Sequence, residues 1–159
     1  DNWLMVRQYR HALDRAVACL AARAHSKHEI EQKLLRVGYR PCTVEMVLYK
    51  LEREHLLNDA DFARQWVEAR SGRKLGRSRI AQELRRKGID AVEAEEGLSA
   101  IGEDAQLADA IALAEKAAAR AKSDEDPRKT YQRIAAMLAR RGFRWDITKE
   151  ALAQVLQAD

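Results

Sequence analysis

Proline, glycine and aromatic residues are scarce in this sequence. Its 159 residues include 2 prolines and 7 glycines, and only 6% are aromatic. A sheet of many short strands needs tight turns, and tight turns depend on glycine and proline. The scarcity therefore argues against an all-β fold. The abundant Ala, Leu, Glu, Arg and Lys favour helices instead.

Long apolar runs and paired cysteines are missing as well. The sequence has no run of about 18 apolar residues, which a membrane-spanning helix would need. Residues 1–7 lack the basic start and apolar run of a signal peptide. We therefore expect a cytoplasmic protein without membrane contacts.

Cys19 and Cys42 form no CxxC pair and predict no disulfide framework. Cys19 shares an apolar helical face with Ala16 and Leu20, which indicates a small buried side chain.

The sequence shows no pattern typical of a catalytic or metal site. A zinc site made of both cysteines with His25 and His28 is conceivable, but the spacings match no common zinc-ligand pattern. Segment 72–77 has two glycines but lacks the G-x-x-x-x-G-K-[ST] pattern of a phosphate-binding loop. The histidines have no serine or carboxylate at a telling spacing, so we expect exposed helix residues. The four histidines are His11, His25, His28 and His55. We expect no enzymatic activity, no metal and no cofactor.

Three segments of the sequence, residues 29–39, 79–89 and 133–143, align with one another without gaps. In each, an Ile is followed four residues later by Leu, four residues after that by Gly, and then by a large apolar residue. Ile and Leu at this spacing lie on one helix face, and the Gly suits the left-handed backbone that ends a helix. The residues in these positions are Ile30, Leu34, Gly38 and Tyr39; Ile80, Leu84, Gly88 and Ile89; Ile134, Leu138, Gly142 and Phe143.

Each aligned helix is expected to have one helix after it and one before it. The matching apolar positions after the glycines are Leu48, Leu98 and Leu152, and then Leu51, Ile101 and Val155. The preceding helices are expected at about residues 9–23, 60–69 and 105–121. Predicted helix starts are the capping box of Ser26 and Glu29, Asn58 or Asp59, and Asp126 followed by Pro127.

These patterns together predict an all-α fold of three tandem three-helix repeats. About nine helices would form an elongated, curved array, because a unit of about 50 residues buries little surface alone. The repeats are expected at residues 1–57, 58–103 and 104–159.

Charge is unevenly distributed along the chain, although the net charge is only +4. Residues 70–90 contain eight basic and two acidic residues, whereas residues 90–126 contain eleven acidic and three basic ones. Segment 71–79 is expected to be a flexible loop in which glycines flank the basic side chains. Such a loop suits an acidic partner surface.

Basic residues also recur in the register of the repeat. Arg36, Arg86 and Arg140 lie two residues before the repeat glycine, and Lys87 and Arg141 follow the last two. A cation near the C-terminus of a helix stabilises the helix dipole by about 0.3–1 kcal/mol. A shared positive ridge that binds a partner is the other interpretation, and the sequence leaves both open.

A tandem helix-turn-helix protein that reads DNA bases is a further alternative. In the second repeat, however, the helix after Gly88 presents Glu93, Glu95 and Glu96, which phosphates lining a groove would repel. Base-specific recognition is therefore not expected from this repeat. Sequence-independent contact with DNA through segment 71–79 stays open, as does a passive helical scaffold.

Three segments, residues 25–39, 51–66 and 76–88, resemble the RecX family of bacterial regulatory proteins that modulate RecA. The aligned pattern of residues 134–143 extends the resemblance to nearly the whole chain. The resemblance implies a regulator that binds along the groove of the RecA nucleoprotein filament. It also implies limits on filament growth, ATPase and strand exchange, which would temper recombination and the SOS response.

The expected partners are therefore the RecA filament and single- or double-stranded DNA, which a monomer would contact without sequence specificity. The residues expected at these contacts are Arg70, Arg73, Lys74, Arg77, Arg79, Arg86, Lys87, Arg140 and Arg141.

Overall fold

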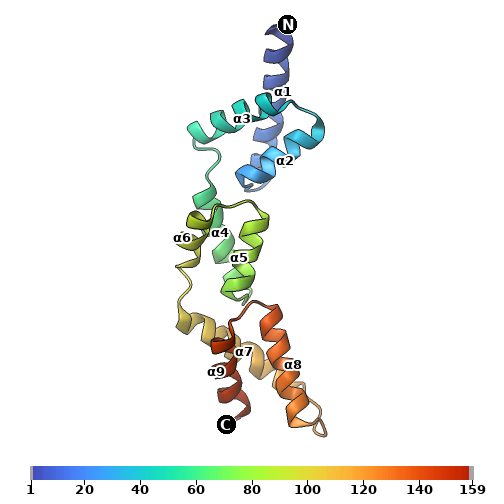
Figure 1. The fold of residues 1–159 in the computed structure, drawn as a ribbon, viewed down its shortest axis with the longest axis vertical. Coiled ribbons are helices and arrows are strands. Elements are labelled where there is room, and N and C mark those ends of the chain that lie inside the picture. Colours follow the sequence, from blue (N-terminus) through green and yellow to red (C-terminus); the bar gives the residue numbers. More distant parts are fainter. Residues whose placement is uncertain (1, 158–159) are drawn as a thin grey trace. The chain divides into compact units, whose positions relative to one another are not determined.

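The structure is a computed structural model that describes residues 2–157. These residues form nine α-helices and no strand (Figure 1), which confirms the predicted all-α fold. The helices are α1 (Asn2–Ala22), α2 (Lys27–Val37), α3 (Pro41–Arg53), α4 (Asp59–Gly72), α5 (Arg77–Arg86), α6 (Ala91–Leu98), α7 (Glu103–Ala119), α8 (Pro127–Arg140) and α9 (Trp145–Leu156).

The helices predicted to open the three repeats are present, with different ends. The largest difference is in α1, which begins at Asn2 and not near Tyr9. Trp3 and Val6 in its first turns are exposed, so the core-facing pattern starts only near Tyr9. Leu, Met, Arg and Gln in those turns are good helix formers, and the helix continues through them without core contacts.

The chain divides into two compact units. The first comprises Asp1–Arg64 and Leu84–Ala94, and the second comprises Gln65–Glu83 and Glu95–Asp159. The three repeat boundaries predicted from the sequence stay a prediction, as does the elongated, curved arrangement of the repeats.

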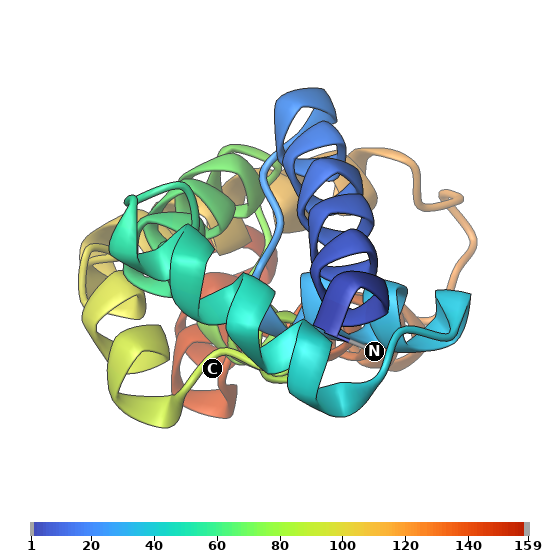
Figure 2. The same ribbon diagram turned by 90° about the horizontal axis from the view of Figure 1, so that it is seen from above.

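In the first unit, α1, α2 and α3 enclose an apolar core. α3 crosses α1, and α2 lies beside the C-terminal half of α1 (Figures 1 and 2). The repeat residues Ile30 and Leu34 are buried against Ala12 and Ala16 of α1. Alanine at these two positions allows the helices to approach closely, because the distance between helix axes depends on the side chains at the contact.

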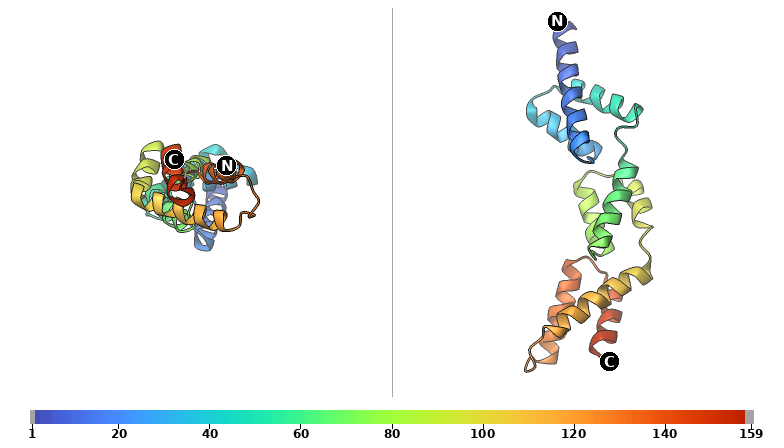
Figure 3. Two further views of the ribbon diagram at one scale, coloured as in Figure 1. Left: turned by 90° about the horizontal axis from the view of Figure 1, so that it is seen from below. Right: turned by 180° about the vertical axis from the view of Figure 1, so that it is seen from behind.

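In the second unit, α7 contacts both α8 and α9 (Figure 3). The repeat residues Ile134 and Leu138 of α8 are buried in a cluster with Ala110 and Ala114 of α7. The repeat stripe therefore meets alanines of the preceding helix here as well. This agreement explains why the Ile and Leu positions align so closely in the sequence.

The three repeat glycines end α2, α5 and α8 as predicted. Their φ angles are +107° at Gly38, +74° at Gly88 and +93° at Gly142. In each case the N–H of the next residue donates to the carbonyl of the repeat leucine, at 3.3, 3.1 and 3.1 Å. A left-handed residue with this bond is a common way to end a helix, and glycine adopts it without a Cβ penalty.

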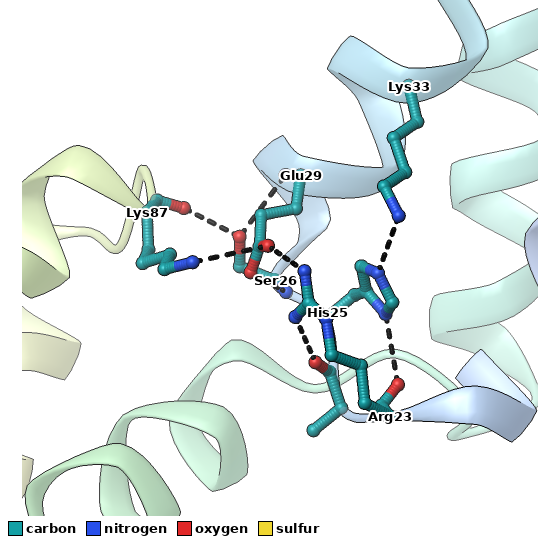
Figure 4. Close-up of polar contacts among 7 residues, drawn as sticks. Arg23, His25, Ser26, Glu29, Lys33 and Lys87 are labelled. Carbon is teal, nitrogen blue, oxygen red and sulfur yellow. Dashed lines mark hydrogen bonds and ion pairs between the residues drawn. The ribbon is translucent and has the colours of Figure 1, made fainter. Parts of the chain in front are cut away.

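The turn between α1 and α2 carries the predicted capping box. The Glu29 N–H donates to Ser26 Oγ at 3.2 Å, and the Ser26 N–H donates to Glu29 Oε1 at 3.3 Å. The Ser26 hydroxyl also donates to the Lys87 carbonyl at 2.6 Å (Figure 4). Glu29 Oε2 pairs with Lys87 Nζ at 3.4 Å and with Arg23 Nη2 at 2.8 Å. The capping box at the start of α2 therefore also binds the end of α5, and we name this contact the first junction.

His25 lies in the same turn and is buried, which corrects the prediction of an exposed helix residue. Its Nδ1 is 2.9 Å from the Arg23 carbonyl oxygen, and its Nε2 is 3.1 Å from Lys33 Nζ (Figure 4). A carbonyl only accepts and an ammonium only donates, so the neutral ring protonated on Nδ1 satisfies both groups. Burial lowers the pKa of His25, and the positive charges of Arg23 and Lys33 lower it further. The hydrogen bond to the Arg23 carbonyl acts in the opposite direction but does not outweigh them.

Other residues singled out from the sequence lie mostly as predicted. The Asp61 N–H donates to Asn58 Oδ1 at 3.1 Å, so Asn58 caps α4, and Asp126 caps α8 just before Pro127. Cys19 is partly buried against the first core, whereas Cys42 is exposed. The remaining histidines are exposed, although one of them lies in the turn after α3 and not in a helix; they are His11, His28 and His55.

We expect alanine substitutions at two of the repeat glycines, Gly38 and Gly142, to cost different amounts of stability. Gly38→Ala should cost about 1 kcal/mol, because only backbone strain opposes it and nothing lies within 4 Å of a Cβ there. A Cβ on Gly142 would lie 2.3 Å from the backbone nitrogen of Arg79. Gly142→Ala should therefore cost about 2–4 kcal/mol. Chemical denaturation measures both, and equal losses would contradict the predicted role of the contact.

We expect the protein to lose stability as the pH falls from neutrality through the ordinary pKa of histidine. The folded state binds a proton at His25 less readily than the unfolded state does, so protonation favours unfolding. His25→Gln should flatten the dependence of unfolding free energy on pH in this range. His11→Gln, at an exposed position of α1, is the matched control. An unchanged pH profile in His25→Gln would show that His25 does not carry the effect.

Candidate functional site

The basic segment 71–79, predicted to be a flexible loop, is mostly helical. α4 extends through Gly72 and α5 begins at Arg77, so only residues 73–76 form a turn. Arg77 and Arg79 consequently lie in the first turn of α5. The prediction was wrong because Lys74, with φ of +57°, takes the left-handed position that glycine holds at the repeat stops.

Arg70 is held within the protein. Its Nη2 and Nε donate to both Glu83 oxygens at 2.6 to 3.0 Å, and its guanidinium lies 5.3 Å from the centre of the Trp66 ring. Glu83 is 8% exposed, so removal of Arg70 would leave a buried carboxylate without this partner. Arg70 was predicted to contact a partner. In the structure it has a role within the fold, because its ion pair with Glu83 joins α4 to α5.

The two predicted residues at the end of α5 differ from each other. Lys87 is engaged in the first junction through its carbonyl and its ammonium (Figure 4). Arg86 is exposed in the last turn of α5. Only Arg86 of this pair presents its charge mainly to solvent.

In the second unit, the start of α5 meets the end of α8, and we name this contact the second junction. The Gly76 N–H donates to the Arg141 carbonyl at 2.7 Å, and the Ser78 N–H donates to the Gly142 carbonyl at 3.2 Å. Arg79 Nη1 donates to the Arg140 carbonyl at 3.3 Å. This contact brings Arg79 close to Arg140 and Arg141, which lie more than sixty positions further along the chain. All three were predicted to contact a partner.

The two junctions use matching positions of the repeat. Counted from the repeat isoleucines, Gly76 corresponds to Ser26 and Arg79 corresponds to Glu29. Both Ser26 and Gly76 donate to the carbonyl of the residue just before a repeat glycine. The charges differ, because the position that holds the carboxylate of Glu29 in the first junction holds the guanidinium of Arg79 in the second.

We define the basic junction as the second junction together with the turn that leads into it. It consists of Arg73, Lys74, Arg79, Arg140 and Arg141. Within the described residues, none of these five forms an ion pair with a carboxylate. Burial raises the pKa of the Asp109 carboxyl on α7, and the charge of Lys74 opposes this rise. Arg77 differs from its neighbours because its Nη2 pairs with Glu95 Oε1.

Backbone donors at the start of α5 are already used inside the protein. The N–H groups of Gly76 and Ser78 bind carbonyls of the second junction, and the Arg77 N–H donates to Gln106 Oε1 at 3.3 Å. The start of this helix therefore offers no free nest of N–H groups for an anion. The features of this helix start that could attract an anion are therefore its basic side chains.

The basic junction consists mostly of exposed, positively charged side chains. Among residues 2–157, no group of three or more His, Cys, Asp or Glu residues is placed to hold a metal ion. The helices of the same part of the chain include none that is long and apolar enough to cross a membrane. Basic side chains near one another attract phosphate or carboxylate groups without fixing a sequence or shape.

Sequence reasoning found the basic residues but missed how they meet. It gave no weight to Gly76, although a Cβ there would lie 2.3 Å from the Gly142 carbonyl carbon. The available signal was the alignment of Gly76 with Ser26, which places a small residue at the same repeat position. Buried His25 was also missed, and its place just before the capping residue Ser26 was the signal that put it outside the helix.

Comparison with known proteins gives matches along most of the chain. Residues 12–51 match the family model of the first three-helix domain of RecX, residues 58–98 that of the second, and residues 104–152 that of the third. Each match contains an aligned Ile, Leu and Gly pattern, which supports a fold of tandem three-helix repeats.

Individual relatives agree with the family models. The regulatory protein RecX of Mycobacteroides abscessus is 38% identical over 84% of this chain and 68% of its own length. That of Chlorobium limicola is 35% identical over 89% of this chain and 87% of its own length. The crystal structure of RecX from Lactobacillus salivarius superposes with a TM-score of 0.87 at 25% identity, and covers 96% of this chain and 99% of that one. The chain belongs to the RecX family of regulatory proteins.

Proposed function

We propose that this protein binds the RecA nucleoprotein filament and limits its growth, ATPase and strand exchange, and so tempers recombination and the SOS response. It acts as a monomer in the cytoplasm and carries out no covalent chemistry. The observation that carries the proposal is the basic junction, whose five cations form no ion pair with a carboxylate of residues 2–157, in a chain that belongs to a family of regulators.

The fold supports binding by occlusion. Three-helix repeats present contact surfaces at intervals along a chain, which suits a partner that is itself a repeating polymer. The basic side chains are long and mostly exposed, so each contact is modest and affinity comes from several of them. Such a regulator would compete for the filament surface and would not need a deep pocket.

A second candidate function is sequence-independent DNA binding without RecA. The same five cations favour it, because neutralised phosphates release counterions and this release drives binding at low salt. The two functions differ in which component, RecA or DNA, determines how much protein is needed for the effect. Filament inhibition should follow the amount of RecA at fixed DNA, whereas simple DNA binding should follow the amount of DNA.

The test is a titration of the protein against RecA ATPase on single-stranded DNA. We expect the double variant Arg73→Glu with Lys74→Glu to need at least about tenfold more protein for half-inhibition, a loss of about 1.4 kcal/mol. Both side chains are exposed in the turn, so the helices should stay intact by circular dichroism.

The matched control reverses two exposed arginines of α1, Arg10→Glu with Arg15→Glu, and should inhibit within about twofold of the wild type. Wild-type protein that leaves RecA ATPase unchanged at every ratio would refute the proposed function. A folded Arg73 and Lys74 variant that inhibits like the wild type would remove the turn from the binding surface.

A further inference from the structure

The two junctions provide an internal comparison within one chain. In both, the start of one repeat's middle helix binds the carbonyl just before the glycine that ends the next repeat's middle helix. In both, a Cβ on that glycine would lie 2.3 Å from a Cβ of the facing helix, of His28 in the first and of Arg79 in the second. The donor is the Ser26 hydroxyl in the first junction and the Gly76 N–H in the second, but Ser26 and Gly76 occupy the same repeat position, so the charged residues around them can be compared.

The first junction contains a carboxylate that pairs with the cation beside the repeat glycine. Glu29 is the third residue of α2 and pairs with both Lys87 and Arg23. Burial alone would raise the pKa of the Glu29 carboxyl. The hydrogen bonds from Arg23 and the Ser26 N–H, together with the charge of Lys87, lower this pKa below its ordinary value. The cation beside the repeat glycine therefore has its counter-charge inside the protein.

In the second junction, no carboxylate of the described part of the chain forms an ion pair with Arg79, Arg140 or Arg141. Arg79 replaces the carboxylate, and it binds the Arg140 carbonyl beside a second arginine, Arg141. Elsewhere in the second unit, arginines do have carboxylate partners, since Arg70 pairs with Glu83 and Arg77 pairs with Glu95. The junction therefore holds a cation at the position where the first junction holds a carboxylate.

We propose that Arg79, Arg140 and Arg141 form a phosphate-binding site, in which a phosphodiester group of a nucleic acid takes the place that the Glu29 carboxylate holds in the first junction. The inference rests on the DNA contact of the proposed function and assigns it to these three residues. Binding there fastens the start of α5 to the end of α8, so the ligand completes the junction that the chain leaves open.

The chemistry of the site favours phosphate over a carboxylate of a protein. All three side chains are guanidiniums, whose planar forks bind phosphate with two hydrogen bonds each. A phosphodiester group presents more than one acceptor oxygen in different directions, which suits several guanidiniums better than a flat carboxylate does. Arg73 and Lys74 lie in the turn just before α5 and supply further cations for neighbouring phosphates of the same strand.

Substitution of Arg79 by glutamate tests the comparison directly, because it gives the second junction the residue that the first one has. We expect Arg79→Glu to melt about 2 °C or more above the wild type without ligand, since the new carboxylate faces the Arg141 end of α8. The same variant should bind a dT oligonucleotide at least about tenfold more weakly by fluorescence anisotropy, with a salt slope reduced by about 1. Arg79→Gln should lose binding without the gain in melting temperature.

Lys116→Glu is the matched control, because it makes the same change of charge at an exposed position of α7. It should bind the oligonucleotide nearly as the wild type does and should not melt higher. If Lys116→Glu reproduced both effects, net charge alone would explain them and the site would be refuted. Wild-type melting that does not rise with the oligonucleotide would also overturn the proposal.

The test separates this inference from the proposed function because no RecA is present. Loss of oligonucleotide binding in Arg79→Glu supports the phosphate site even if the wild type fails to inhibit RecA ATPase. If Arg79→Glu binds the oligonucleotide like the wild type but no longer inhibits RecA, the three arginines face an acidic protein surface, and the phosphate assignment is wrong.

Discussion

The contact between a left-handed glycine and the start of a facing helix is the constraint on which the rest of the structure depends. At the second junction, no side chain larger than that of glycine fits at Gly142, because the backbone of Arg79 occupies the space. This close approach lets N–H groups at Gly76 and Ser78 bind carbonyls at the end of α8, which the helix itself leaves unpaired. A repeat that buries little surface alone is thereby tied to the next one.

The same contact sets the electrostatics of the candidate site. Helix ends that meet at this short distance bring their flanking side chains together, and the flanking residues of α8 are Arg140 and Arg141. The sign of the charge at one matching position then differs between the junctions, because Glu29 occupies it in the first and Arg79 in the second. A carboxylate there pairs with the neighbouring cations, whereas a guanidinium adds to them.

Local patterns allowed much of the fold to be predicted, because they describe residues that are close in the chain. Ile and Leu four residues apart, the glycine after them and the capping box of Ser26 and Glu29 all act within one helix or turn. The junctions could not be predicted in this way, since Gly76 and Arg141 are far apart in sequence and only packing brings them together. The predicted loop failed for a local reason: Lys74 adopts a left-handed backbone that its residue type does not signal.

The recurrence of arginine before each repeat glycine allowed two interpretations, and the surroundings of these arginines differ between the repeats. Arg36 lies near the end of α2, and nothing lies within 4 Å of a Cβ on Gly38. For Arg36, stabilisation of the helix dipole is the simpler of the two interpretations. Arg140 also lies in the last turn of its helix, but its carbonyl accepts a hydrogen bond from Arg79, which places a second guanidinium beside it. The helix dipole accounts for a cation at the end of α8, and the phosphate site that we propose would account for the further arginines, Arg79 and Arg141, at the same helix end.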